Sequence, residues 1–469
     1  MLRSFRVGNH RSFRDEQELL LLPVYAKDRE VLPVAAVYGA NASGKSNLLD
    51  GLKFMADAVR DSFSQWRPGG GVPRRPFKLD PTARERPSVF VADFVESGVR
   101  YTYGFEIDDE RVLSEWLYSY PEKRKRVLFE RVDDRVKLGK AVAGVQAKVE
   151  VLEDLLRPNS LFVSLAAQSN IAALVPVYRW FVGMVNFRLD GDPSDVESGV
   201  VDFLREHGTM HGPLVALLRV ADLGISDVLL KEDVDPGLLS SYEDEYMGAR
   251  RELSRLRLEL IDREAGLPGT SPLGAQSNRL PVEVVDAEVR YVASRERLAR
   301  LRQEAEHARR QVRLSHAHGD EPFRLDEESA GTRSWLGLLP VVLRVLREGG
   351  VLVIDEIDAS LHSLLSARLI ALFRDSDTNP GNGQLVFTTH DATLLHPPLA
   401  DEVLDRDEVW FVEKDEKGVS GLYPLSDFKP RREDNLERRY LAGQYGAVPN
   451  LYEERFMDAV RNGVADDQA

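Results

Sequence analysis

The sequence of 469 residues contains no cysteine. This absence excludes disulfide bonds, zinc sites built on thiolates and cysteine nucleophiles, and it favours an intracellular protein. No run approaches the roughly 20 apolar residues that a helix needs to cross a bilayer. The N-terminal segment MLRSFRVGNHRSFRD also lacks the apolar core of a signal peptide. We therefore expect a cytoplasmic protein with no membrane association.

Basic residues are outnumbered by acidic ones. The chain has 62 Lys and Arg against 77 Asp and Glu, which gives a formal net charge of −15. A surface of this sign repels nucleic acid, so any contact with DNA would need a local basic patch. The most basic run is the tetrad from Lys123 to Arg126, and such a run is more often a solvated hairpin than a DNA contact.

The clearest motif that is present is GANASGKS, from Gly39 to Ser46, which fits the pattern GxxxxGK[ST]. It follows the β-prone run Val34–Tyr38 and precedes a helical pattern from Asn47 to Val59. Glycines allow backbone N–H groups to surround phosphate oxygens at the helix N-terminus, where Lys45 adds positive charge and Ser46 can hold Mg²⁺. We predict that the ATP-binding residues of this loop are Gly39, Ala40, Asn41, Ala42, Ser43, Gly44, Lys45, Ser46 and Asn47.

A second motif, VLVIDE, lies far downstream and ends at Glu356. Four apolar residues predict a buried parallel strand, which places Asp355 and Glu356 at its C-terminal edge, where ligands of α/β proteins bind. We expect Asp355 to support the Mg²⁺ shell and Glu356 to orient and polarise the attacking water. An apolar strand followed by two acids is common by itself, so this prediction depends on the phosphate loop.

Two further segments fit the same kind of site. The run QLVFTTH ends at His390 and predicts another buried strand, one helix and one strand after the acidic motif. A βαβ crossover places such strand ends side by side, so His390 is a candidate contact of the γ phosphate. Upstream, EESAGTR opens a helical pattern, and its small residues resemble the start of an anion-binding helix.

In this order, GANASGKS, ESAGTR, VLVIDE, DASLH and TTH resemble the ABC-type ATPase head shared by SMC, RecF and OLD proteins. The sequence is more closely similar to the prokaryotic "AAA family ATPase" group of phage-defence systems, which includes RloA-like proteins and the ATPase subunits of Septu and PARIS. The opening FRVGNHRSFRDEQELLL, the segment LFVSLAAQSN and the closing YLAGQYGAVP also look like that group.

This resemblance implies an active site shared by two protomers. ATP would lie between the phosphate loop of one copy and Ser329 and Gly331 of the other, with Asp358 at the dimer seam. Many ABC proteins carry LSGGQ where this chain has ESAGT, so the strength of those contacts in trans is open. Gln168 is the candidate for the glutamine that senses Mg²⁺ and water, although a plain polar loop residue is an equal alternative.

Other segments complete the expected architecture. Residues 80–135 alternate apolar and polar side chains with turns between them, which predicts antiparallel strands and thus the β lobe of the head. The segment Arg67 to Pro81 is predicted to be a surface loop. Two heptad arms, one from Tyr242 to Leu260 and one from Val284 to Val312, flank a glycine- and proline-rich break and predict an antiparallel helical hairpin. The hairpin would either protrude towards a partner or pack on the head.

The predicted fold is therefore α/β, a P-loop NTPase of the ABC-ATPase type with an antiparallel β lobe and an inserted helical hairpin (short coiled coil). Residues 1–235 would form the N-terminal ATPase lobe, 236–315 the hairpin, and 316–469 the C-terminal lobe. About eighty residues follow His390, which we expect to be too few for a fused nuclease domain. Asp401, Asp405 and Asp407 are interpreted as a polar loop.

We predict an ATPase with the cofactors ATP and Mg²⁺ that dimerises or forms a higher oligomer and controls a separately encoded effector, a nuclease or toxin, in anti-phage defence. The trigger could be DNA or a phage component. The alternative is a RecF- or SMC-like ATPase that acts directly on DNA in repair or chromosome maintenance. A transporter subunit would share the fold but would need neither the opening segment FRVGNHRSFRDEQELLL nor the helical insertion.

Overall fold

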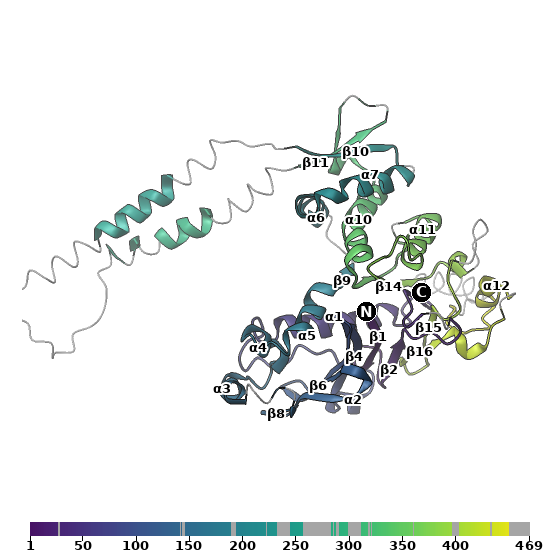
Figure 1. The fold of residues 1–469 in the computed structure, drawn as a ribbon, viewed down its shortest axis with the longest axis horizontal. Coiled ribbons are helices and arrows are strands. Elements are labelled where there is room, and N and C mark those ends of the chain that lie inside the picture. Colours follow the sequence, from purple (N-terminus) through teal and green to yellow (C-terminus); the bar gives the residue numbers. More distant parts are fainter. Residues whose placement is uncertain are drawn as a thin grey trace, which may run out of the picture. The chain divides into compact units, whose positions relative to one another are not determined.

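The computed structural model describes residues 1–26, 29–140, 142, 146–188, 194–221, 223–231, 244–256, 283–284, 286–287, 290–298, 311–317, 319, 321–359, 361–395, 403–431 and 434–449. They belong to two compact units (Figure 1). The larger unit combines Met1–Gly191 with Leu338–Ala469, and the smaller is Asp192–Gly337. This division differs from the predicted segments 1–235, 236–315 and 316–469, whose folding as separate domains stays a prediction.

A six-stranded sheet forms one half of the larger unit. Its strands, in spatial order, are β16 (Ser420–Pro424), β15 (Val409–Lys414), β3 (Val34–Tyr38), β14 (Gln384–Thr389), β13 (Val351–Ile354) and β9 (Val185–Arg188). All adjacent pairs are parallel except β15 and β16. Strands β3, β13 and β14 are fully buried, as expected for parallel strands covered on both faces. Their C-terminal ends therefore meet at one edge of the sheet.

Helices pack beside this sheet. Helix α1 (Lys45–Asp61) follows β3, α11 (Ser363–Arg374) links β13 to β14 and packs on β3 and β14, and α12 (Leu436–Leu441) lies near the C-terminus. Helix α10 (Ala330–Glu348) precedes β13 and belongs to this unit from Leu338 onwards. The apolar face of α1, which includes Leu48, Leu52 and Met55, is buried in a core that also contains residues of both sheets.

The second sheet of the larger unit is the predicted antiparallel β lobe. Its order is β2 (Gln17–Leu20), β1 (Leu2–Gly8), β4 (Ser88–Glu96), β5 (Val99–Ile107), β6 (Val112–Tyr120), β7 (Arg126–Val132) and β8 (Arg135–Leu138). The basic tetrad Lys123–Arg126 lies at the connection from β6 to β7, and all four of its residues are exposed. The predicted exposed position in a hairpin is therefore confirmed, while the absence of a DNA contact stays a prediction. Helix α1 packs against β1 and β4.

Short helices complete this lobe. They are α2 (Pro81–Glu85), α3 (Gln146–Leu155), α4 (Phe162–Gln168) and α5 (Val175–Arg179), and α5 continues into a π-helical turn, Trp180–Met184. Helix α4 is fixed by a buried carboxylate of β6, because Glu115 accepts hydrogen bonds from the backbone N–H groups of Phe162 and Val163 at 2.6 and 2.9 Å. These N–H groups lie in the first turn of α4 and would otherwise lack an acceptor.

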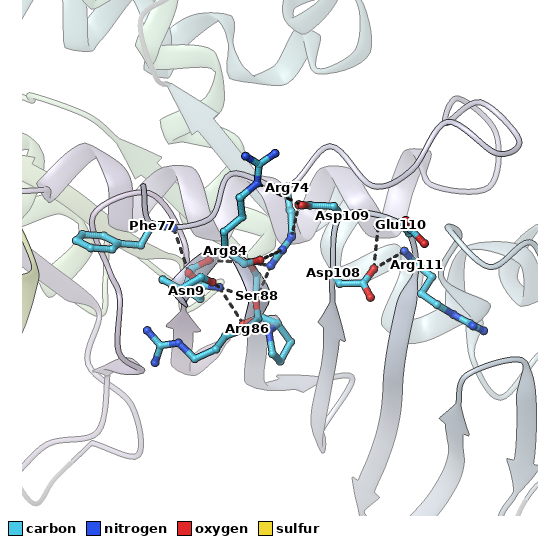
Figure 2. Close-up of polar contacts among 12 residues, drawn as sticks. Asn9, Arg74, Phe77, Arg84, Arg86, Ser88, Asp108, Asp109, Glu110 and Arg111 are labelled. Atoms are coloured by element: carbon cyan, nitrogen blue, oxygen red, sulfur yellow. Dashed lines mark hydrogen bonds and ion pairs between the residues drawn. The ribbon is translucent and has the colours of Figure 1, made fainter. Parts of the chain in front are cut away.

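The segment Arg67–Pro81 is irregular, as predicted, but it is not simply a surface loop. The side chain of Arg74 is only 1% exposed, and it donates hydrogen bonds to the carbonyl oxygens of Arg84 and Arg86 and to Asp109 Oδ1, each at 2.7 Å (Figure 2). Asn9 accepts from the N–H of Phe77 and donates to nearby carbonyl oxygens. A surface-loop pattern gives no sign of such an anchor, because both residues are polar.

The smaller unit contains α6 (Ser194–Glu206), α7 (His211–Val220), the first residues of α10 and a three-stranded antiparallel sheet. The strands of this sheet are β10 (Ile225–Lys231), β11 (Gln311–His316) and β12 (Phe323–Arg324). Helix α7 packs on β10 and α6 on β11, where Glu197 of α6 accepts a hydrogen bond from the N–H of Val312.

The described parts of the two heptad arms are helical over 244–256, 283–284, 286–287 and 290–298, and they contact each other. Val312, which the prediction assigned to the second arm, lies instead in strand β11. Leu253 packs with Val284 and Ala287, while the rings of Tyr246 and Tyr291 stack 5.7 Å apart. These pairs run in opposite directions along the two arms, in agreement with the predicted antiparallel hairpin. Tyr242, Leu260, Leu301, Ala305 and Ala308 lie outside the described residues, and the protrusion of the hairpin stays a prediction. Within the described part of the chain, no helix is long and apolar enough to cross a membrane.

Candidate functional site

The phosphate loop connects β3 to α1. Gly44 precedes α1 in a left-handed conformation, with φ 115°, and Ala42 is also left-handed, with φ 62°. The N–H of Ser43 donates to the carbonyl of Ala40 at 3.1 Å, which closes the loop on itself. The first N–H groups of α1 have no acceptor within the helix, so they are available to an anion at this position. The local geometry therefore suits a phosphate chain, as predicted from the sequence.

Lys45 is buried at the first position of α1, and its ammonium donates to the carbonyl oxygens of Gly39 and Ala40 at 2.7 and 3.1 Å. Burial lowers the pKa of Lys45, and the negative charges of Glu356, Asp355 and Asp358 oppose that shift. The structure therefore brings the lysine of the first motif into the field of the acids of the second. More than three hundred residues separate these motifs in the sequence.

Two serines that sequence reasoning missed form hydrogen bonds with residues of this loop and of the start of α1. Ser12 Oγ accepts from Asn47 Nδ2 at 2.7 Å and lies 2.8 Å from Ser420 Oγ, and the Ser420 hydroxyl donates to the carbonyl oxygen of Ser43 at 2.5 Å. A Cβ atom at Gly44 would overlap both hydroxyls. Ser12 belongs to the opening segment FRVGNHRSFRDEQELLL, which resembles known ATPases, but Ser420 carried no signal because a lone serine in a strand is common.

The acidic turn begins where β13 ends. The carboxylate of Asp355 accepts a hydrogen bond from the hydroxyl of Thr388 in β14 at 2.5 Å, and that same hydroxyl accepts from the N–H of Glu356 at 2.7 Å. The backbone of Glu356 is left-handed, with φ 48°, and its side chain is exposed. Asp355 is thus held in place, while Glu356 projects from the edge of the sheet towards solvent.

His390 follows β14 and contacts Asp358, since its Nδ1 lies 3.0 Å from Asp358 Oδ2. The imidazole is 58% exposed, whereas the Asp358 carboxylate is only 7% exposed. Asp358 Oδ1 and the hydroxyl of Ser43 are buried without a hydrogen-bond partner in the described structure. Buried polar atoms with unused capacity are expected where a ligand or water binds. Asp358 therefore contacts His390 of its own chain, a pairing that its expected place at a dimer seam did not include.

The segment ESAGT, residues 328–332 and called the signature segment below, lies in the smaller unit. The hydroxyl of Ser329 accepts from the N–H of Thr332 at 3.1 Å and lies 2.8 Å from the Thr332 hydroxyl, so Ser329 caps α10. Gly331 lies in the first turn of this helix. The predicted helix start is confirmed, while the action of both residues in trans stays a prediction.

Gln168 is the last residue of α4 and is exposed. Among the described residues, α4 donates hydrogen bonds from its first turn to Glu115. Its Ser164 Oγ accepts from the N–H of Phe63, which follows α1. None of the contacts seen among the described residues joins Gln168 to the phosphate loop, and its role as a metal-sensing residue stays a prediction.

The remaining candidates suit a nucleotide-bound magnesium ion. Ser46 is exposed at the start of α1, and Asp355 lies at the edge of the same sheet. One hydroxyl and one carboxylate are the protein ligands that Mg²⁺ commonly uses when phosphates and water supply the rest. No group of three or more His, Asp or Glu able to hold a metal ion occurs among the described residues.

Comparisons with known proteins agree with this site. A family model described as "AAA domain, putative AbiEii toxin, Type IV TA system" matches residues 34–140 and 212–396, which is more than half of the chain. The match covers the phosphate loop, the signature segment, the acidic turn and His390. No curated protein matches the sequence.

Solved structures of SMC heads are similar to the chain over most of its length. An SMC head bound to the C-terminal winged-helix domain of ScpA is 12% identical and has a TM-score of 0.43, with 92% of this chain and 99% of that chain covered. The SMC head domain of Thermotoga maritima is 12% identical at a TM-score of 0.37, with coverages of 90% and 98%. Because both TM-scores are below 0.5, the assignment depends on the family match and on the site itself. On those grounds the chain belongs to the AAA-domain family of ATPases described by that model.

Proposed function

We propose that this protein hydrolyses ATP at the edge of its six-stranded sheet and that the ATP cycle controls a separately encoded effector. The observation that carries the proposal is the convergence of three strand ends. The phosphate loop follows β3, the acidic turn follows β13, and His390 follows β14, which pairs with both other strands. Lys45 lies in the field of the acidic turn, so these segments form one site.

The residues divide the chemistry between them. Lys45 and the N–H groups of the loop bind the β and γ phosphates, while Ser46 and Asp355 would hold Mg²⁺. When bound, Mg²⁺ neutralises charge that develops on the phosphate oxygens. Glu356 accepts a hydrogen bond from the attacking water and orients it towards the γ phosphate. His390, oriented through Nδ1 by Asp358, presents Nε2 to the γ phosphate.

The proposal includes dimerisation around ATP. The capped start of α10 offers the Ser329 hydroxyl and the backbone at Gly331 as contacts for the γ phosphate of a second copy. Two copies would close when ATP binds and open after hydrolysis, so that the chemistry drives a conformational cycle. Gln168 would report on Mg²⁺ and water between the lobes.

Light scattering in the presence of MgATP tests this part. Glu356→Gln should trap ATP and give twice the monomer mass, and Gly331→Arg should abolish that gain while ATP binding remains. Gly212→Arg is the matched control, because Gly212 is an exposed helical glycine of the same unit, and a Cβ added there would meet nothing within 4 Å. A Glu356→Gln protein whose mass is the same with and without ATP would contradict ATP-driven closure.

The effector would be a nuclease or toxin made by another gene, released or activated when phage infection is sensed. The test is a plating assay with the chain and its neighbouring genes, in which Lys45→Ala should remove protection against phage. If protection persists in Lys45→Ala at normal protein levels, control by ATP is wrong.

One observation favours the alternative, direct action on DNA. The tetrad Lys123–Arg126 is exposed in a chain of net charge −15 and is its most basic run. Salt-sensitive binding of duplex DNA by the isolated protein, lost when Lys123 and Arg124 become glutamate, would favour a RecF-like role. Binding that does not change in the variant would exclude the tetrad as the contact.

A further inference from the structure

Thr388 is a buried hydroxyl in an apolar strand. It lies in β14 after Leu385, Val386 and Phe387, and it is 0% exposed. Burying a hydroxyl without hydrogen bonds costs free energy, so its partners explain why a threonine is tolerated at this position. Both partners lie in the acidic turn of the neighbouring strand β13.

The chemistry of the partners fixes the direction of both hydrogen bonds. A backbone N–H can only donate, so the Thr388 oxygen accepts from Glu356. An ionised carboxylate can only accept, so the Thr388 hydroxyl proton points to Asp355 Oδ1. One hydroxyl therefore joins the backbone of the proposed water-orienting residue to the side chain of the proposed metal ligand.

The backbone of Thr388 adds a third contact, because its carbonyl accepts from the N–H of Ile357 at 3.1 Å. Glu356 lies between these contacts in a left-handed conformation, with φ 48°. Such a conformation is unfavourable for a non-glycine residue and persists only where neighbours enforce it. The Thr388 contacts supply that enforcement on both sides of Glu356.

The neighbouring threonine behaves differently. Thr389 is also fully buried, but its hydroxyl accepts only from the N–H of Asp391, two residues further along the same chain segment, at 3.0 Å. Thr389 thus shapes a local turn, whereas Thr388 reaches across to β13. Thr388 and His390, which follows the end of β14, both contact the acidic turn, at Asp355 and Asp358 respectively.

We propose that Thr388 is a positioning residue for hydrolysis, which holds Asp355 in the orientation that binds Mg²⁺ and sets the backbone from which Glu356 reaches the water. This inference rests on the proposed ATPase function. The hydrogen bond from Thr388 to Oδ1 of Asp355 would hold the carboxylate in one orientation, in which it could take part in a Mg²⁺ site. Loss of the hydroxyl would leave Asp355 free to rotate and remove the bond that fixes the N–H of Glu356.

The test compares Thr388→Val, which has a similar shape but no hydroxyl, with Thr388→Ser, which keeps it. ATP hydrolysis is measured against Mg²⁺ and ATP concentration, with nucleotide affinity and thermal stability measured on the same samples. Loss of a group that orients a metal ligand commonly costs 10–100-fold in activity or metal affinity. We expect Thr388→Val to lose about that factor in kcat and to need more Mg²⁺, with little change in ATP affinity without metal, and Thr388→Ser to recover most of the loss.

Ser366→Ala is the control for removal of a buried hydroxyl. Ser366 lies in α11 and is 0% exposed, and its hydroxyl has no hydrogen-bond partner among the described residues, so its variant should keep the wild-type kcat and Mg²⁺ dependence. If valine prevents folding, Thr388→Cys provides the same comparison, because a thiol is a weak donor and acceptor.

Two results would overturn the inference. One is a folded Thr388→Val protein with the wild-type kcat and Mg²⁺ dependence, and the other is an equal loss in the serine and valine variants. If Glu356→Gln hydrolyses ATP normally, the proposed function itself is wrong. If Glu356→Gln is inactive but Thr388→Val is not, only the role of Thr388 fails.

Discussion

The two sheets of the larger unit both bury polar groups, but they use them differently. In the antiparallel sheet, Glu115 accepts at both carboxylate oxygens, from Tyr103 and from the first turn of α4, and lies 3.6 Å from the guanidinium of Arg131. At the edge of the parallel sheet, Ser43 Oγ and Asp358 Oδ1 are buried with no partner among the described residues. The hydrogen bonds of Glu115 hold the antiparallel lobe together, whereas the unused capacity of Ser43 and Asp358, at the phosphate loop and the acidic turn, is available to a ligand.

This comparison explains why charge alone does not locate the site. Arg74 and Glu115 are buried like Lys45, yet their contacts are with backbone groups and side chains of the same lobe. Lys45, the first residue of α1, donates to carbonyl oxygens of the phosphate loop. Its ammonium also interacts with the negative charges of the acidic turn. Variants in the antiparallel sheet should therefore change stability, and variants at the parallel edge should change ATP chemistry.

The largest effect is expected at Glu115. In Glu115→Ala, Arg131 would be buried without its counter-charge and the N–H groups of Phe162 and Val163 would lose their acceptor. Breaking a buried ion pair from one side costs about 3–5 kcal/mol. Urea unfolding should show a loss of that size, while the folded fraction still binds ATP. A loss below about 1 kcal/mol would show that this network does not support the lobe.

A smaller effect, but one on ATP, is expected at Gly44. Gly44→Ala would place a Cβ against Ser12 and Ser420 in a left-handed backbone. Strain of this kind costs about 1–3 kcal/mol, which corresponds to roughly 10- to 100-fold weaker ATP binding. Gly98→Ala is the control from the antiparallel sheet, because Gly98 is also left-handed, with φ 77°, but its Cβ would meet nothing within 4 Å. Titration of ATP by calorimetry should separate the two, and equal affinities would contradict the support assigned to the serines.

The smallest effect concerns pH and Glu408, beside β15. Burial raises the pKa of this carboxyl to about 7, while Arg374 opposes the shift. Between the unfolded value near 4.5 and about 7, the folded protein holds the extra proton, so stability falls as pH rises through this window. Glu408→Gln should flatten that slope and add about 1–3 kcal/mol at pH 8 relative to the native chain. Unfolding curves at pH 5 and pH 8 check this, and an unchanged slope would contradict it.

The parallel half was predictable because its signals are local and repeated. The apolar runs Val34–Tyr38 and Val351–Ile354 form strands with the same first and last residues as the runs. The phosphate loop follows the first run, and two acidic residues follow the second. The βαβ rule then placed His390 beside the acidic turn, and the structure confirms this arrangement through the pairing of β13 with β14.

Residues that act through tertiary contact could not be predicted. Thr388 is one threonine of a pair in an apolar strand, and only the register of β14 against β13 shows that its hydroxyl meets the acidic turn. Ser420 and Arg74 are similar cases, because their partners are distant in sequence. Asp407, interpreted as part of a polar loop, is buried and accepts from three successive N–H groups of residues 24–26. Asp401, assigned to the same loop, lies outside the described residues.

The most direct test of the central claim is the rate of phosphate release by Glu356→Gln at saturating ATP and Mg²⁺. The glutamine keeps the size of Glu356 but is a poor acceptor for the proton of water, so release should fall by about 100-fold or more while ATP binding stays at the native level. Release at the native rate would contradict the assignment of the acidic turn as the catalytic site. Loss of both release and binding would mean that Glu356 supports the shape of the nucleotide site rather than the attack of water.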